Sequence, residues 1–335
     1  MPLVALDCEG PLTLNDNAYE FAEALIPRGG EFFARVSRYD DYLADVEKRA
    51  GYKAGDTLKL ILPFLKAYGA TNSLLREFSR KTLRVLPGAV EVLRTLPGFL
   101  PTFIISTSYR PYLEALCEVA GFPLEQVFCT EVDFETVKIS PTEARVLKEF
   151  CEKILQLPLI EIPEGAQGPA DLPPESRQAV EVLEEIFWQR LPEMEAGRFL
   201  QEVNPVGGAE KARALETALS ETGLSPLEAL YLGDSITDVE ALELVRQGGG
   251  GAVAFNANRY ALRAAEFYVL SEKAQPELEL ARAFAEQGRE GLVELAHRAS
   301  QAYEMGLVAE APEDLVSRSE DFRKGVRGET IGALG

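Results

Sequence analysis

Short apolar runs that end in polar residues are the feature that most constrains the fold of this chain. The first run, Leu3–Leu6, leads directly into Asp7 and then Glu9, and runs at 102–106 and 227–232 have the same form. A short apolar run bounded by turn residues is typical of a buried strand. Helix-like stretches follow these runs, so the sequence predicts an α/β fold built on a parallel sheet.

The strand–helix alternation occurs in three blocks that long helical stretches separate. The predicted units are a core (1–14, 86–137 and 204–272), a helical cap inserted after the first strand (15–85), a second helical insertion (138–203) and a C-terminal helical extension (273–335). Within the extension we predict one helix over 276–305, followed by a polar tail of mixed charge that is partly disordered. The second insertion is interpreted either as a second lid or as an oligomer surface.

Composition excludes several classes of partner. The formal net charge of −20 disfavours nucleic acids and anionic membranes, which select clustered Lys and Arg. No apolar run approaches the roughly 20 residues of a membrane span, and the first residues lack a signal-peptide pattern. The four cysteines fit neither a metal site nor a disulfide framework, and His297 is the only histidine. We therefore expect a cytoplasmic protein without His-based catalysis, and with no nucleic-acid or membrane partner.

Reactive side chains follow the predicted strands at the positions where the strands end. In a parallel sheet the carboxyl ends of all strands lie at one edge, which is where ligands bind. That edge would bring together Asp7, Glu9, Ser106, Thr107, Asp234 and Asp238, with Lys211 from the start of a helix. Carboxylates suit Mg²⁺, a hydroxyl with backbone N–H groups suits a phosphate, and a lysine can balance their charge. A carboxylate can also accept a phosphoryl group.

Plainer interpretations of the same residues remain open at this point. Asp7 and Glu9 can simply open a solvated loop, and Lys211 can be a surface lysine of its helix. Ser235 and Thr237 can equally serve as N-caps of the following helix.

In order and spacing, these motifs resemble those of the haloacid dehalogenase (HAD) superfamily. The matching residues are Asp7-Cys-Glu9-Gly10, Phe103-Ile-Ile-Ser106, Lys211 and Gly233-Asp234-Ser-Ile-Thr-Asp238. The stretch that starts at Leu86-Pro-Gly looks like the helix that often precedes the second motif, and the segment around Asn256 resembles part of the phosphoserine phosphatases. The resemblance covers the three core blocks. It implies a HAD-type, Rossmannoid parallel sheet with a helical cap.

The resemblance also implies a role for each matching residue. Asp7 would be the nucleophile that forms an aspartyl-phosphate. Glu9 would be the general acid and base, and its backbone carbonyl would bind Mg²⁺. Ser106 would donate a hydrogen bond to the phosphoryl group, and Lys211 would neutralise that group and Asp7.

The remaining matches concern the metal and the phosphate. Asp234 would be a further Mg²⁺ ligand, and Asp238 would support the metal site. Thr107 and Asn256 are expected on the phosphate side.

The resulting prediction is a Mg²⁺-dependent, HAD-type phosphomonoester hydrolase that acts on a small phosphorylated metabolite. Glu9 stands where the usual motif has Asp, as is familiar in the phosphoserine phosphatase-like branch. The longer side chain must still reach the leaving oxygen, and it can bias the reaction toward transfer to an alcohol. The alternatives are therefore a phosphotransferase with the same site, and a non-catalytic binding or regulatory protein on a HAD core. The sequence leaves the substrate and the oligomeric state open.

Overall fold

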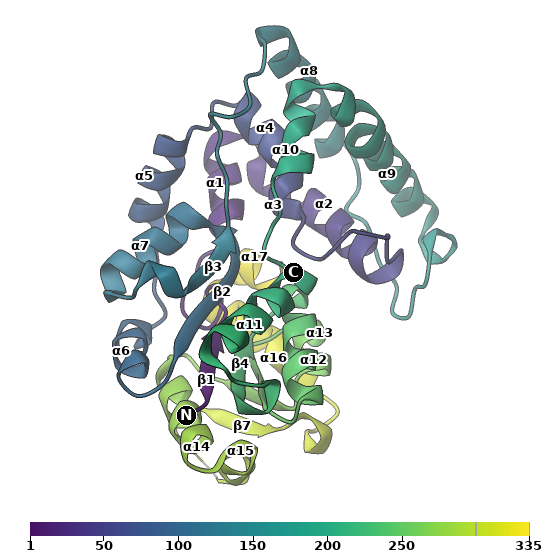
Figure 1. Cartoon of the computed structure of the whole chain (residues 1–335). Coiled ribbons are helices and arrows are strands. Elements are labelled where there is room, and N and C mark those ends of the chain that lie inside the picture. Colours follow the sequence, from purple (N-terminus) through teal and green to yellow (C-terminus); the bar gives the residue numbers. More distant parts are fainter. Residues whose placement is uncertain (299, 335) are drawn as a thin grey trace.

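The computed structural model describes residues 1–298 and 300–334, and a seven-stranded sheet lies at its centre (Figure 1). The strand order is β3-β2-β1-β4-β5-β6-β7, and all neighbouring pairs are parallel except β6 and β7. The strands are β1 (Leu3–Leu6), β2 (Thr102–Tyr109), β3 (Val127–Thr130), β4 (Ala229–Gly233), β5 (Gly251–Phe255), β6 (Phe267–Leu270) and β7 (Glu304–Leu307). The predicted α/β fold with a parallel sheet is confirmed.

Helices cover both faces of the sheet, which explains why β1, β4 and β5 are buried along their whole length. Apolar residues of α6, α7, α14 and α15 pack on one face, and those of α11, α12 and α13 pack on the other. Within the described ranges, no helix combines the length and the apolarity needed to cross a membrane. The helix bounds are α6 (Ala89–Thr95), α7 (Arg110–Ala120), α11 (Ala209–Thr222), α12 (Val239–Gln247), α13 (Arg259–Ala264), α14 (Gln275–Gln287) and α15 (Arg289–Ala296).

The buried side chains of the two helical insertions belong to a single apolar cluster, so the insertions pack as one unit, which we call the cap. Helix α8 packs against α2 and α4 of the first insertion, and Figure 1 shows these helices together, away from the sheet. Arg35 and Arg38 of α2 donate hydrogen bonds to the backbone carbonyls of Leu157 and Ile160. The cap helices are α1 (Asn17–Leu25), α2 (Gly29–Asp41), α3 (Thr57–Leu60), α4 (Leu62–Ala67), α5 (Asn72–Thr82), α8 (Pro141–Leu155), α9 (Pro174–Glu184) and α10 (Arg198–Glu202).

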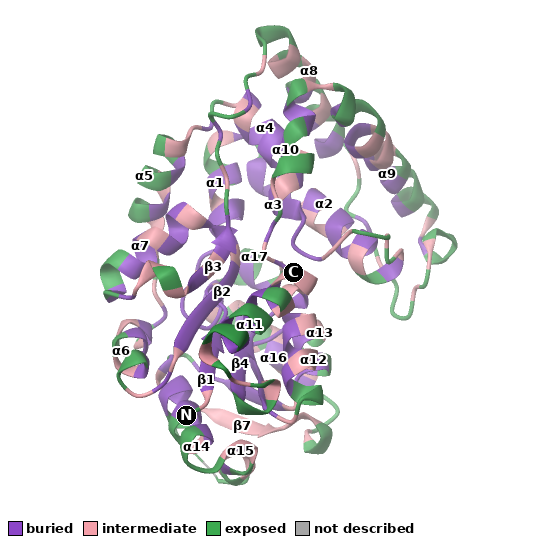
Figure 2. Ribbon diagram, viewed as in Figure 1, coloured by how far each residue is buried: buried purple, intermediate pink, exposed green. Residues whose placement is uncertain are grey.

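The C-terminal extension differs from the prediction. The single helix expected over 276–305 is wrong: α14 ends at Gln287, and the positive φ of 60° at Gly288 separates it from α15. Strand β7 then adds an antiparallel edge to the sheet. The tail that was expected to be partly disordered forms α16 (Leu315–Arg327) and α17 (Glu329–Gly332). It packs back on the protein, with buried residues along both helices (Figure 2).

Glu277, in the first turn of α14, provides a test of this packing. Its side chain is fully buried, and neither carboxylate oxygen has a hydrogen-bond partner among the described residues. Burial raises its pKa well above the usual value, so the folded state keeps a proton that the unfolded chain loses. Stability should therefore fall as the pH rises above the unfolded pKa, by at most about 1.4 kcal/mol per pH unit. Glu277→Gln should remove this slope in urea denaturation between pH 5 and pH 9; parallel pH profiles for the two proteins would contradict the assignment.

Candidate active site

Asp7 lies at the carboxyl end of β1, at the centre of the sheet. Its backbone N–H donates to the carbonyl of Leu232 at 2.9 Å, which continues the pairing with β4. One carboxylate oxygen, Oδ1, accepts the N–H of Cys8 at 2.7 Å, and the other, Oδ2, lies 2.9 Å from Nζ of Lys211. Only 4% of Asp7 is exposed. The carboxylate is thus fixed in orientation and paired with a cation, as a nucleophile at this edge requires.

Lys211 reaches Asp7 from the first turn of α11 and is completely buried. Its Nζ also donates to Oδ1 of Asp238 at 2.7 Å, and Tyr231 donates to the same oxygen at 2.8 Å. The other oxygen of Asp238 accepts the backbone N–H groups of Asp234 and Ser235 at 3.0 and 3.1 Å. All these contacts are with protein groups, so Asp238 holds Lys211 and the loop after β4 in place. Tyr231 was not anticipated, because its position in an apolar strand indicates only core packing.

The backbone conformation and surroundings of Gly10 explain why a glycine follows the two acids of the first motif. Its φ is +111°, a conformation that L side chains rarely adopt, and an added Cβ would lie 2.2 Å from Oδ2 of Asp234. The backbone after β1 therefore comes close to the carboxylate after β4, and both acids share one site.

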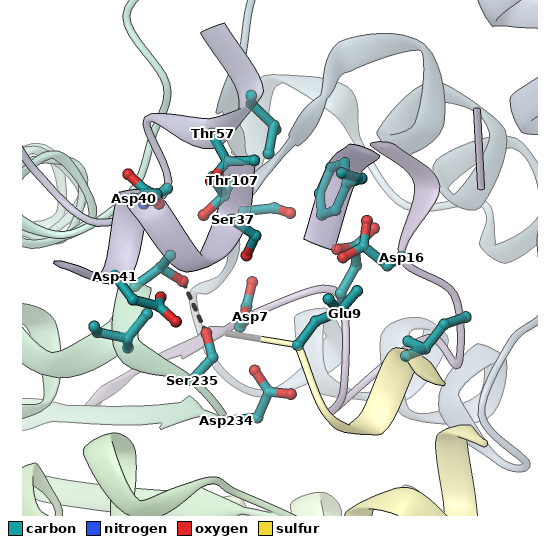
Figure 3. A pocket seen from close by; sticks show the side chains of 18 of the residues that line it. Asp7, Glu9, Asp16, Ser37, Asp40, Asp41, Thr57, Thr107, Asp234 and Ser235 are labelled. Carbon is teal, nitrogen blue, oxygen red and sulfur yellow. Dashed lines mark hydrogen bonds between the residues drawn. The ribbon is translucent and has the colours of Figure 1, made fainter. Parts of the chain in front are cut away.

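Glu9 points into the same cavity as Asp7 (Figure 3). Its Oε1 accepts the backbone N–H of Asn17 at 2.8 Å, at the start of the cap. Burial, reinforced by the neighbouring charge of Asp16, raises the pKa of Glu9 to about 8. A carboxyl group that keeps its proton at neutral pH is suited to donate it to a leaving group.

The hydroxyl groups of β2 line the cavity beside the acids. The strand continues to Tyr109, beyond the predicted end, with a register shift between Ile105 and Tyr109. Ser106 accepts the N–H of Ser108 at 3.2 Å, so its own proton is available to a ligand. The hydroxyl of Thr107 is buried without a hydrogen-bond partner among the described residues. Both hydroxyl groups can therefore donate a hydrogen bond to a ligand, which suits the predicted phosphate-binding role.

Asn256 is placed differently from its predicted phosphate-binding position. Its amide donates to the carbonyl of Ser271 at 2.7 Å and accepts the N–H of Ser271 at 2.8 Å. It does not line the cavity that contains Asp7. Asn256 therefore joins the ends of β5 and β6, and we do not retain it among the phosphate-binding residues.

Two arginines from α16 reach the site, and the sequence analysis missed both. Arg323 and Arg327 form ion pairs with Oδ2 of Asp234, the latter at 3.0 Å. Their exposed fractions are only 3% and 6%. Their spacing of four residues places both arginines on one face of a helix, and this spacing could have indicated a shared role. The tail contains many other charged residues, so the pair did not stand out in the sequence.

The cap and the C-terminal segment close the cavity. Ser37, Asp40 and Asp41 of α2 lie opposite Asp7 and Asp234 (Figure 3), and Ile331 and Leu334 complete the wall. The cavity volume is about 90 Å³, below the roughly 300–1,000 Å³ of ordinary ligand pockets. A substrate larger than its phosphoryl group therefore requires movement of the cap or of the C-terminal segment.

The acids fit a divalent cation in type and number, but their partners do not leave room for one. Carboxylate oxygens of Asp7, Asp234 and Asp238 lie within 4.8 Å of one another. Both oxygens of Asp238 already accept hydrogen bonds from protein groups, and Asp234 is paired with two guanidinium groups. The predicted Mg²⁺ does not fit this arrangement of Asp234, so the metal site stays a prediction and no step below depends on it.

Burial dominates the electrostatics of the acids. It raises the pKa of Asp7 to about 8, reinforced by Asp238 and opposed by Lys211. Burial also raises the pKa of Asp234, although Arg323 and Arg327 oppose the shift. Nearby cations therefore decide which acid is ionised. Asp7 has Lys211 at ion-pair distance, whereas Glu9 forms no ion pair within the described residues, so the proton belongs on Glu9.

Similar proteins were found among solved structures but not by the two sequence comparisons. Neither a scan against protein-family models nor a search of curated proteins found a match. The chain is similar to the solved structure of gene product AF1437 from Archaeoglobus fulgidus, with 29% identity, 100% of this chain and 99% of that chain covered, and a TM-score of 0.87. A HAD family hydrolase from Salmonella enterica serovar Typhi matches with 12% identity, 77% and 62% covered, and a TM-score of 0.44. A substrate-bound phosphoserine phosphatase matches with 12% identity, 84% and 98% covered, and a TM-score of 0.48.

The sheet and the position of the motifs agree with the fold that the resemblance to the HAD superfamily implies. The mostly parallel sheet has β1 at its centre, flanked by β2 and β4, and the four motifs meet at its carboxyl edge. The catalytic roles of Asp7, Glu9, Ser106 and Lys211 stay predictions, which the geometry now makes specific.

Replacing Lys211 tests the charge pairing on which this geometry rests. Lys211→Met leaves Asp7 and Asp238 buried without their shared cation, which should destabilise the protein by about 3–5 kcal/mol. Arg213→Met, on the exposed side of the same helix, is the control and should change stability by less than about 0.5 kcal/mol. Equal effects of the two substitutions in urea denaturation would show that the Lys211 contacts are not stabilising.

Proposed function

We propose that this protein is a phosphomonoesterase that hydrolyses a small phosphorylated metabolite through an aspartyl-phosphate on Asp7. The observation that carries the proposal is the pairing of a fixed, lysine-neutralised carboxylate with a second acid that holds its proton in the same cavity. Nucleophile and general acid are the two groups that phosphoryl transfer to a carboxylate needs.

In the first step, an oxygen of Asp7 attacks phosphorus and the bond to the leaving oxygen breaks. Glu9 gives its proton to that oxygen, so the product leaves as an alcohol. Ser106 and the hydroxyl of Thr107 donate hydrogen bonds to phosphoryl oxygens, because neither proton is required elsewhere. Lys211 stays in place beneath Asp7 and balances the negative charge that the phosphoryl group brings.

In the second step, Glu9 is a carboxylate and accepts a proton from water. The water oxygen attacks the phosphorus of the acyl-phosphate, and the bond from phosphorus to Asp7 breaks. Inorganic phosphate leaves, Asp7 is a carboxylate again and Glu9 has regained its proton. If an alcohol takes the place of water, the same residues perform phosphoryl transfer.

Substitutions of the two acids separate these roles. Asp7→Asn should reduce hydrolysis of an aryl phosphate to background, and Glu9→Gln should lower kcat for an alkyl phosphate by about 10²–10⁴-fold. An aryl phosphate should suffer less from Glu9→Gln in the first step, because its leaving group needs less protonation. Glu91→Gln is the matched control, because Glu91 is an exposed residue of α6.

Hydrolysis that Asp7→Asn leaves unchanged would reject Asp7 as the nucleophile, and absence of hydrolysis by the wild type would favour a binding or regulatory protein on this core. Product analysis in the presence of added alcohols measures how the acyl-phosphate divides between water and alcohol. Alkyl phosphate as the main product would identify a phosphotransferase instead.

A further inference from the structure

The C-terminal helix α16 delivers two buried cations to an acid of the site. Nη1 of Arg323 contacts both the backbone carbonyl of Asp234, at 3.0 Å, and its carboxylate. Nη1 of Arg327 lies 3.0 Å from the same carboxylate oxygen. Burial of a guanidinium group is costly unless it is paired and hydrogen-bonded, so these contacts define a built arrangement.

Backbone carbonyls hold the remaining N–H groups of both arginines. Arg323 donates to the carbonyls of Gly332 and Leu334, at 3.1 and 3.2 Å, within its own C-terminal segment. Arg327 donates to the carbonyl of Asn15 at 2.5 Å, in the loop that follows the first motif. The guanidinium groups therefore connect the C-terminal segment, Asp234 and the loop that carries Glu9, and Figure 1 shows α17 between cap and sheet.

Three of the four residues on the most buried face of α16 are polar or charged, although Leu315, Val316 and Phe322 of the same helix pack against apolar residues of the core. The buried residues of α16 are Leu315, Ser319, Arg323 and Arg327, each four positions after the previous one. Ser319 donates to the carbonyl of Ala257 at 2.6 Å, so this residue too binds through a polar contact. An apolar stripe is the usual means of attaching a helix to a core. Here the face is shaped to place charge at the site.

Three cations are paired with the three carboxylates that lie closest to the nucleophile, Asp7 included. The carboxylates of Asp7, Asp234 and Asp238 face the cations of Lys211, Arg323 and Arg327. A divalent cation bound to Asp234 would lie beside two buried guanidinium groups that already pair with this carboxylate, and the low-dielectric interior disfavours such like-charge neighbours. The arginine pair and a divalent cation are therefore alternatives at Asp234.

We propose that Arg323 and Arg327 supply the positive charge that a divalent cation would otherwise bring to Asp234, so that this site works without a metal. The inference rests on the proposed function and states which groups supply the positive charge beside Asp234. Both arginines act through Asp234 and are positioning residues. The structural match to gene product AF1437 covers the whole of this chain, so it includes the C-terminal segment. This coverage and the carbonyl contacts favour a permanent part of the site over a detachable inhibitor.

The first test uses the wild-type protein. After EDTA treatment and gel filtration, aryl phosphate hydrolysis should be unchanged, added Mg²⁺ should not raise it, and electron paramagnetic resonance should detect no Mn²⁺ bound at the site. Activity that disappears with EDTA and returns with Mg²⁺ would overturn the inference but leave the proposed function standing. Absence of hydrolysis with and without metal, and of any phosphorylated Asp7, would reject the proposed function itself.

The second test asks whether a divalent cation can replace the two arginines at Asp234. Arg327→Gln should lower kcat by about 10²-fold, and Mg²⁺ should restore part of that loss because the charge at Asp234 is then unbalanced. The double variant Arg323→Gln/Arg327→Gln should bind Mn²⁺, whereas wild type should not. Arg318→Gln is the control, because Arg318 lies on the same helix and pairs with Glu304 outside the cavity.

Two results of the second test would overturn the inference. Higher activity of the double variant than of wild type, in the presence of Mg²⁺, would identify the segment as an inhibitor that covers a metal site. Loss of activity that Mg²⁺ does not relieve, without Mn²⁺ binding, would reduce the arginines to a structural role. If the variants fail to fold, the metal titration of wild type still decides the question.

Discussion

The ion pairs of Lys211 are the interaction on which the rest of the site depends. Two carboxylates that follow different strands, Asp7 after β1 and Asp238 after β4, share one completely buried ammonium group. The close approach of Gly10 to Asp234 then places a third carboxylate beside them. Such a concentration of acids is stable only with matching cations, and helices α11 and α16 provide them. The same contacts therefore stabilise the fold and hold the reactive groups of the site in place.

The cap shows how the chain encloses this charge cluster. Two insertions that are separated in sequence share one apolar core, so they behave as one cover above the carboxyl edge of the sheet. The cavity between cap and sheet is small, and the C-terminal segment fills part of its wall. Exclusion of water strengthens every electrostatic contact inside. It also makes substrate entry dependent on a movement of these elements.

The sequence predicted the sheet and the acid–lysine cluster, because local patterns encode them. Apolar runs mark β1, β4 and β5, and the carboxyl-edge rule brings Asp7, Lys211 and Asp234 together. It did not predict the break at Gly288, where one backbone conformation divides a helical pattern. It also missed Arg323 and Arg327, since their role depends on a contact with Asp234, which lies 89 and 93 positions earlier in the sequence. Asn256 was misplaced because a side chain in a loop can bond to its own backbone surroundings instead of a ligand.

The phosphorylation of Asp7 is the claim that can be measured most directly. The protein is mixed with a radiolabelled phosphomonoester, quenched in acid during turnover, digested and mapped by mass spectrometry. The account predicts an acid-stable, base-labile phosphoryl group on the peptide that contains Asp7, and none in Asp7→Asn. Steady hydrolysis of the substrate with the label on another residue, or on none, would contradict it.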